Sequence, residues 1–183
     1  SAVLTITEDD PVPPVGSLQF SGATYSVAEN ITTATITVTR TGGSFGAASV
    51  NYATSNGSAS AGSDYTATSG TIHFTDGDAV VKTFNVAISN DATYEGDETV
   101  NLALSNATGA SLGAPASAVL TISEDDPVPP VGSLQFSAPT YSVAENITTA
   151  TITVTRSGGS FGAASVAYAT SNGSASAGSD YTA

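Results

Sequence analysis

The 183-residue sequence contains no cysteine, no methionine and no tryptophan, and it has a single histidine. Disulfides, thiolate metal sites and chemistry that needs cysteine or several histidines are therefore excluded. Only 3 residues are basic against 16 acidic ones, so the formal net charge is −13. Nucleic acids and anionic membranes need basic patches, so we expect neither as a partner, and the charge balance favours cations instead.

Long hydrophobic runs are also missing. No stretch of 18 apolar residues occurs, so we expect no direct insertion into a membrane. The first ten residues, SAVLTITEDD, have neither the basic start nor the apolar stretch of a signal peptide, so a targeting signal would have to lie outside this sequence.

What the sequence does contain is a long repeat. The segment that begins at Ser1 returns at Ser117, 116 residues later, and only five of the 67 compared positions differ: Thr7/Ser123, Gly22/Ala138, Ala23/Pro139, Thr41/Ser157 and Asn51/Ala167. A unit of this length suits an independently folding domain better than a solenoid repeat. We therefore expect a window cut from a tandem array. Its parts are the final strand of a preceding repeat (1–10), a Pro-rich linker (11–16), one complete domain (17–126), a second Pro-rich linker (127–132) and the N-terminal part of the next repeat (133–183).

Strand patterns fill the complete domain. Apolar and polar residues alternate in TATITVTR (33–40), FNVAI (84–88), TVNLALS (99–105) and AVLTI (118–122), with Gly, Ser, Asn and Asp clusters between them. No window has a helical period. The pattern predicts an all-β fold, a two-sheet antiparallel β-sandwich of the immunoglobulin-like kind. We expect about seven strands, at 17–27 (in two segments, 17–20 and 24–27), 33–40, 48–54, 70–74, 80–88, 98–105 and 117–122.

The acids do not lie on these strands. Residues 90–99, NDATYEGDET, contain four carboxylates and no basic residue. Because neighbouring strands alternate in direction, every second turn falls at the same end of a sandwich. That rule gathers eight carboxylates at one end, and we call this set the acidic end: Glu29, Asp64, Asp91, Glu95, Glu98, Glu124, Asp125 and Asp126.

Oxygen ligands on loops suit a hard cation, and Ca²⁺ fits better than Mg²⁺, which keeps its waters and uses few carboxylates. Eight carboxylates exceed what one ion needs, so we expect two or more Ca²⁺ ions in each complete domain. The alternative is an acidic end that is only solvated by water.

The stretches SDYTATSGT (63–71) and DATYEGDET (91–99), with the terminal EDD (124–126), resemble the Calx-beta domain, which occurs in sodium–calcium exchangers, in an integrin tail and in large bacterial surface proteins. The resemblance covers the whole unit and both partial units. It implies a calcium-binding sandwich whose ligands are the acidic end, with Asn90 where strong binders often have Asp. Equivalents in the partial repeats would be Glu8, Asp9, Asp10, Glu145 and Asp180.

Other polar residues have simpler interpretations. His73 is predicted to be a sheet-face residue, and Asp76 and Asp78 to be turn residues, because TDGD itself supplies turn chemistry. Asp97, beside Gly96, is expected to point to solvent. No base partners the many serines, and the carboxylates are better explained as ligands, so we expect no enzymatic activity.

The favoured function is a calcium-binding structural repeat that stiffens an extracellular or cell-surface stalk or fibre, from a bacterium by the family resemblance. The EDD triplet runs directly into proline (EDDPVPPVG, 124–132), so bound calcium would hold the start of the linker. The expected partners are neighbouring identical repeats in the same chain, with lateral or end-to-end self-association. Two alternatives stay open: an adhesive ligand-binding module and a regulatory calcium sensor.

Overall fold

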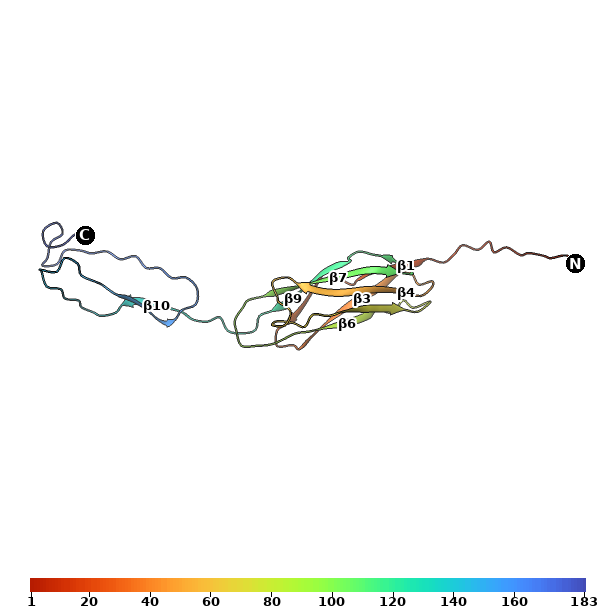
Figure 1. The fold of residues 1–183 in the computed structure, drawn as a ribbon, viewed down its shortest axis with the longest axis horizontal. Coiled ribbons are helices and arrows are strands. Elements are labelled where there is room, and N and C mark those ends of the chain that lie inside the picture. Colours follow the sequence, from red (N-terminus) through yellow and green to blue (C-terminus); the bar gives the residue numbers. More distant parts are fainter. The chain divides into compact units, whose positions relative to one another are not determined.

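The alternating segments of the repeat fold as strands, because their apolar residues occupy every second position and can share one buried layer. The computed structural model describes residues 1–183 and divides them into two units, Ser1–Asp126 and Pro127–Ala183 (Figure 1). No helix long and apolar enough to cross a membrane is present.

The first unit contains two sheets. One has the order β6-β3-β1-β8 and the other β2-β9-β7-β4-β5. The strands are β1 (Val15–Phe20), β2 (Thr24–Ala28), β3 (Thr33–Gly43), β4 (Ala48–Asn56), β5 (Ser69–Phe74), β6 (Lys82–Ala87), β7 (Glu98–Thr108), β8 (Ser111–Leu112) and β9 (Ser117–Ser123). The predicted all-β sandwich is confirmed.

The inner faces of the two sheets form one core. Leu18, Ile36, Val50 and Leu120 are completely buried, and they alternate with polar residues along their strands. Tyr52 stacks on Phe84 across the core with a ring separation of 4.0 Å. Thr, Ser and Asn occupy most of the outer positions, as the sequence pattern indicates.

The two strand segments expected at 17–20 and 24–27, which together count as the first strand, are both present but lie in different sheets. β1 belongs to one sheet and β2 to the other, with a break at residues 21–23. β2 then pairs with β9 in parallel, and β1 pairs with β8 in parallel, so the sandwich is not purely antiparallel. The switch between sheets brings the end of β2, and hence Glu29, beside the end of β9.

Residues 1–10, expected to be a final strand, contain no strand in this structure. Their counterpart β9 lies between β2 and β7, and residues 1–7 have no such neighbours within the chain. Val3, Leu4 and Ile6 are 86% to 90% exposed as a result. The first regular strand, β1, begins at Val15, within the segment expected to be linker.

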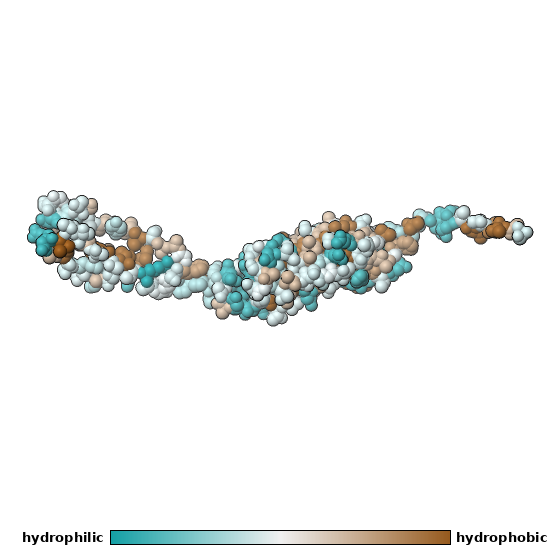
Figure 2. Space-filling model, in the orientation of Figure 1, coloured by the Kyte–Doolittle hydropathy of each residue, from teal (hydrophilic) through white to brown (hydrophobic).

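The second unit has one two-stranded sheet, β10 (Val131–Phe136) and β11 (Val154–Gly159). The register of this pair matches that of β1 and β3, with Val131 opposite Gly159 just as Val15 is opposite Gly43. Figure 2 shows apolar surface in brown on this unit and on the N-terminal segment.

Candidate metal centre

Four loops of the complete repeat bring carboxylates to one concavity. It is lined by Glu29, Asp64, Glu95, Gly96, Glu98, Ile122 and Glu124. Glu29 follows β2, Glu98 begins β7, and Glu124 follows β9. The wall that faces the core is Ile122, which is buried in the sandwich. Segments separated by nearly 100 residues in the sequence therefore supply one site.

Two groups of carboxylates are close enough to share a cation. Glu29, Glu124 and Asp125 can place one oxygen each so that all three lie within 4.8 Å of one another, and Asp64, Glu95 and Glu98 can do the same. Carboxylate oxygens on loops are the ligands that Ca²⁺ prefers. The two groups therefore have the composition of two neighbouring cation sites.

Glu124 is fixed by the backbone around it. One of its oxygens accepts hydrogen bonds from the N–H groups of Glu95 (2.6 Å) and Gly96 (2.8 Å), and the other accepts from Asp126 N–H (2.8 Å). These three bonds, that from Asp126 first, lower the pKa of Glu124 to about 2. The low pKa keeps Glu124 ionised, so its carboxylate retains the negative charge that a cation site needs.

Glu98 shows the opposite behaviour. Burial, a hydrogen bond to Asp64 and the charge of Asp64 raise the pKa of Glu98 to about 7. Burial also raises the pKa values of Glu29, Glu95 and Asp126, and neighbouring carboxylates raise them further. Burial first, and neighbouring carboxylates second, therefore raise the pKa values of four of the acids when no cation is present.

The basic residues are engaged elsewhere. Lys82 pairs with Asp78 at 2.8 Å, and Arg40 donates to backbone carbonyls.

One carboxylate oxygen, Oδ2 of Asp126, is buried without any hydrogen-bond partner. A buried acceptor with no donor costs free energy, and a bound cation would satisfy it. The residues present therefore fit a divalent cation.

The loop that carries Asp64 is fixed by its own hydrogen bonds. Asp64 Oδ2 accepts from Ser60 N–H at 2.7 Å, and Asn56 Oδ1 accepts from Ala61 N–H and from the Tyr65 hydroxyl. The buried Tyr65 ties this loop to the core, with 1% of its surface exposed. The approach of Asp64 to Glu98 is set in this way.

The remaining predicted ligands lie around this centre. Asp91 is exposed, but its N–H donates to Glu29 Oε1 at 3.2 Å, and its charge acts on Glu29, Glu95 and Asp126. Asn90 donates through Nδ2 to the Asp91 carbonyl, so that contact directs its amide to the backbone of its own loop.

Two residues of the site were not assigned to it from the sequence. Asp97, expected to point to solvent, is exposed but accepts the Glu124 N–H at 3.0 Å, and Asn30 Nδ2 donates to Asp125 Oδ2 at 2.7 Å. The sequence offered one indication of these roles: Asp97 is adjacent to Glu98, and Asn30 is adjacent to Glu29. Asp76 and Asp78 are turn residues away from the site, with Asp76 accepting Gly46 N–H and Asp78 accepting Val80 N–H.

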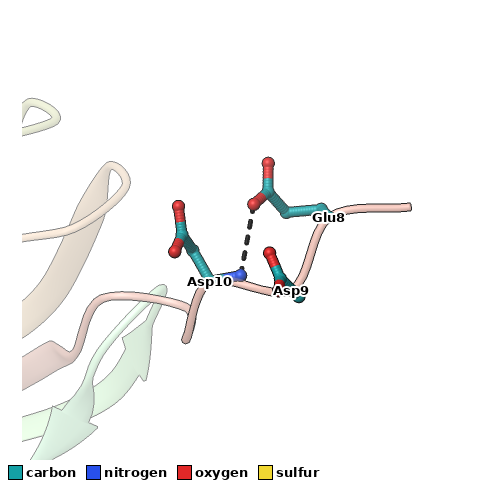
Figure 3. A group of neighbouring side chains, drawn as sticks. All are labelled: Glu8, Asp9 and Asp10. Atoms are coloured by element: carbon teal, nitrogen blue, oxygen red, sulfur yellow. Dashed lines mark hydrogen bonds between the residues drawn. The ribbon is translucent and has the colours of Figure 1, made fainter. Parts of the chain in front are cut away.

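The equivalents in the partial repeats are not assembled. Glu8, Asp9 and Asp10 form a third close group, but all three are exposed in the N-terminal segment (Figure 3). Asp10 N–H donates to Glu8 Oε1 at 3.2 Å, the counterpart of the bond from Asp126 to Glu124. Glu145 and Asp180 are exposed, and the second unit has no counterpart of Glu95, Glu98 or Glu124.

Fold and site together define an all-β sandwich with a carboxylate-lined concavity, a candidate cation centre, in the loops at one end. The model of the Calx-beta domain matches residues 13–126 and again residues 130–183, so the chain belongs to the Calx-beta domain family. It is 33% identical over 194 residues to sodium/calcium exchanger 1 of Bos taurus and 30% identical over 202 residues to sodium/calcium exchanger 3 of Homo sapiens. These matches cover 96% and 98% of the chain but only 19% and 21% of the two exchangers.

Solved structures are similar in the same way. The apo-form Calx CBD1 domain has a TM-score of 0.57 and 32% identity, with 60% of this chain and 97% of that one covered. The calcium-binding domain CBD12 of CALX1.1 has a TM-score of 0.57 and 30% identity, with 71% and 53% covered.

Proposed function

We propose that the complete repeat binds two Ca²⁺ ions at the acidic end. The observation that carries the proposal is the set of carboxylates brought together without a cation: two close groups, four raised pKa values and the unpartnered Asp126 Oδ2. Bound Ca²⁺ would supply the positive charge that offsets this repulsion. The similarity to CBD12 of CALX1.1, a calcium-binding domain, supports the same ion.

The carboxylates would form two sites. Asp64, Glu95 and Glu98 would hold one ion, and Glu29, Glu124 and Asp125 the other, with Asp91 and Asp126 beside them. Glu124 would also organise the site, because its backbone hydrogen bonds tie the loop after β6 to the end of β9. Ca²⁺ accepts six to eight oxygens in flexible geometry, whereas Mg²⁺ demands a near-ideal octahedron, so loop carboxylates favour Ca²⁺.

We also propose a mechanical role: the repeat would stiffen an extracellular or cell-surface stalk of a bacterial protein. The cation centre ends at Asp126, and Pro127 follows at once, so ions held there would fix the start of the linker to the next repeat. Two successive Calx-beta matches in this chain support an array of such units. The uncharged outer faces fit a scaffold without a binding patch.

A second candidate is a regulatory calcium sensor, which the similarity to sodium/calcium exchangers favours. Affinity separates the two. Extracellular modules bind Ca²⁺ with Kd values of about 10⁻⁴–10⁻³ M, whereas intracellular sensors have values of about 10⁻⁷–10⁻⁵ M.

Calorimetric titration and thermal melting of the full chain test the proposal. We expect Ca²⁺ but not Mg²⁺ to raise the melting temperature relative to EDTA, because a ligand that binds only the folded state stabilises it. Glu98→Gln should weaken binding, and Asp76→Asn, at the other end of the sandwich, is the matched control. An equal melting temperature in Ca²⁺ and EDTA would rule out the cation centre, and a submicromolar Kd would favour the sensor.

A further inference from the structure

Arg40 is the one buried charged residue of the core, and it contacts no carboxylate. Its guanidinium donates only to backbone carbonyls: Nε and Nη2 to Val15 at 3.0 and 2.7 Å, Nη1 to Gly46 at 2.9 Å and Nη2 to Phe45 at 3.0 Å. Val15 is the first residue after the prolines of the first linker. The side chain therefore joins the incoming linker to the loop between β3 and β4.

The second unit repeats this arrangement around the second linker. Arg156 donates through Nε to Val131 at 2.8 Å, through Nη1 to Gly162 at 2.8 Å and through Nη2 to Phe161 at 2.7 Å. Arg156 is only partly buried, and most of the sandwich is absent around it. The arginine contacts are therefore a local property of residues 131–162 and do not need the rest of the core.

The backbone strengthens the same attachment. Phe161 N–H donates to the Pro130 carbonyl at 3.3 Å, as Phe45 N–H does to the Pro14 carbonyl at 3.2 Å. A Cβ on Gly159 would lie 2.0 Å from the Pro130 oxygen, so only glycine lets the two segments approach this closely. The end of the linker is thus hydrogen-bonded to, and closely packed against, the repeat that follows it.

The start of the linker is attached to the repeat that precedes it. Glu124 N–H donates to Asp97, and Asp126 N–H donates to Glu124. Between Asp126 and Pro130 only three residues remain, Pro127, Val128 and Pro129. Each of them is a proline or precedes one, which fixes φ near −65° or restricts the backbone to extended conformations. Three such residues span at most about 10 Å.

We propose that Arg156, and its equivalent in each repeat, is a positioning residue that fixes the linker to the following repeat independently of metal, so that the joint between repeats bends only at residues 127–129. The calcium ions of the preceding repeat would fix the other end of the linker, and this half rests on the proposed function. The arginine half does not, because its acceptors are the carbonyl of Val131 at the end of the linker and the carbonyls of Phe161 and Gly162 in the following repeat, and none of these residues belongs to the acidic end.

The guanidinium is suited to this task because its planar fork reaches three carbonyls at once. A lysine ammonium keeps the charge and most of the aliphatic stem but cannot match the fork. Arg156→Lys is therefore the mild variant, and Arg156→Gln removes the charge as well. Arg40→Gln is the matched control, because it breaks the same contacts around the first linker only.

The test measures the width of a distance distribution across the joint in the full chain. Because the chain has no cysteine, Ser105→Cys on β7 and Ser157→Cys on β11 give two unique sites for spin labels, and both positions are exposed. Pulsed electron resonance then gives the distribution in saturating Ca²⁺ and in EDTA. We expect Arg156→Gln and Arg156→Lys to widen it about twofold or more in Ca²⁺, while Arg40→Gln leaves it unchanged.

Two further readouts separate a local effect from unfolding. Calorimetry should give the same calcium affinity for Arg156→Gln as for the parent, and hydrogen exchange should show lost protection at the Phe161 amide with β10 and β11 still paired. A width unchanged in both Arg156 variants would overturn the proposal. Widening by Arg156→Gln without any effect of EDTA would uphold it and refute the calcium-dependent half of the joint.

Discussion

Residues 15–67 and 131–183 differ at four positions, yet the two copies have different structures. Phe20 and Ile36 are completely buried, whereas their counterparts Phe136 and Ile152 are 58% and 50% exposed. β2 and β4 have no counterparts in the second unit. The four differences are small and do not explain this. The reason is that β2 and β4 form against β9, β7 and β5, which lie in residues 68–126, whereas the sequence stops at Ala183, before the equivalent segment.

What the two copies share is equally informative. The pairing of β1 with β3 recurs in β10 with β11, and the arginine contacts recur with it. The loop before Asp64 also recurs: Ser176 N–H donates to Asp180, and Ala177 N–H and the Tyr181 hydroxyl donate to Asn172. Each of these structures forms within one stretch of about 30 residues or fewer. Interactions of short range are thus encoded locally, while burial depends on the second half of the repeat.

The largest expected effect comes from the core. Phe20→Ala should lower the free energy of unfolding of the complete repeat by about 3–5 kcal/mol, because it removes a fully buried ring. Phe136→Ala should change it by less than about 0.5 kcal/mol. Both rings make a similar edge contact with a tyrosine, at 6.3 Å to Tyr25 and 6.5 Å to Tyr141, so the pair isolates the rest of the core. Denaturant unfolding gives both values, and equal losses would mean that the second copy is also packed.

The second-largest expected effect is a difference in calcium affinity between matched substitutions in the two copies. Asp64→Asn should lower calcium affinity at least tenfold, about 1.4 kcal/mol, because it removes a charged ligand. Asp180→Asn, the same change in the second copy, should leave the affinity and the number of bound ions unchanged. Calorimetric titration measures both quantities. A loss of affinity in Asp180→Asn would show that the second copy binds calcium without the remaining ligands.

The pH dependence of the metal-free protein is the next contrast. The folded pKa of Glu98 is about 7 against an ordinary value of 4.5, so the folded state binds more protons between these values. Stability should therefore fall as the pH rises from about 4.5 to about 7 in EDTA. Below 4.5 the sign reverses for Glu124, whose pKa of about 2 means that its stabilisation is lost on acidification.

Glu98→Gln should flatten the upper part of this profile, with melting in EDTA as the measurement. Hydrogen exchange in the second unit is the internal control, because that unit has no counterpart of Glu98. A variant that keeps the full slope would assign the effect to Glu29, Glu95 and Asp126 instead.

The smallest expected effect is chemical. Asn56 and Asn172 both precede glycine, where the glycine nitrogen can attack the side-chain amide carbon, release ammonia and form a succinimide that hydrolyses to aspartate or isoaspartate. Gly57 N–H donates to the Thr99 carbonyl of β7 at 3.1 Å, whereas Gly173 N–H donates to the Ala175 carbonyl of its own loop at 3.2 Å and has no strand beside it. We expect Asn172 to deamidate several-fold faster in peptide mass spectrometry. Equal rates would show that the contact with β7 gives no protection.

Much of the candidate site could be predicted from the sequence, because the number of strands before a turn shows at which end of the sandwich that turn lies. Alternating strands place the turns that carry Glu29, Asp64 and Glu98 at one end, and the structure brings these residues together. The supporting contacts of Asp97 and Asn30 could not be predicted. The Asp97 contact joins segments 27 residues apart and the Asn30 contact joins segments 95 residues apart, and each depends on the conformation of a single side chain. The parallel pairing of β2 with β9 was also missed, because alternation shows which side of a strand is buried but not its partner.

The repeat, the alternating strands, the short Pro-rich joint and the separation of acids from strand faces can all be recognised in the sequence. Each of these is written in neighbouring residues, through side-chain period, backbone restriction or charge. Three outcomes required the folded structure: which copy of a repeated segment is buried, how Glu98 and Asp64 come into contact, and why the pKa of Glu124 is lowered while that of nearby Glu98 is raised. Those outcomes depend on distances between segments far apart in the chain, and burial and electrostatic interaction are set by such distances.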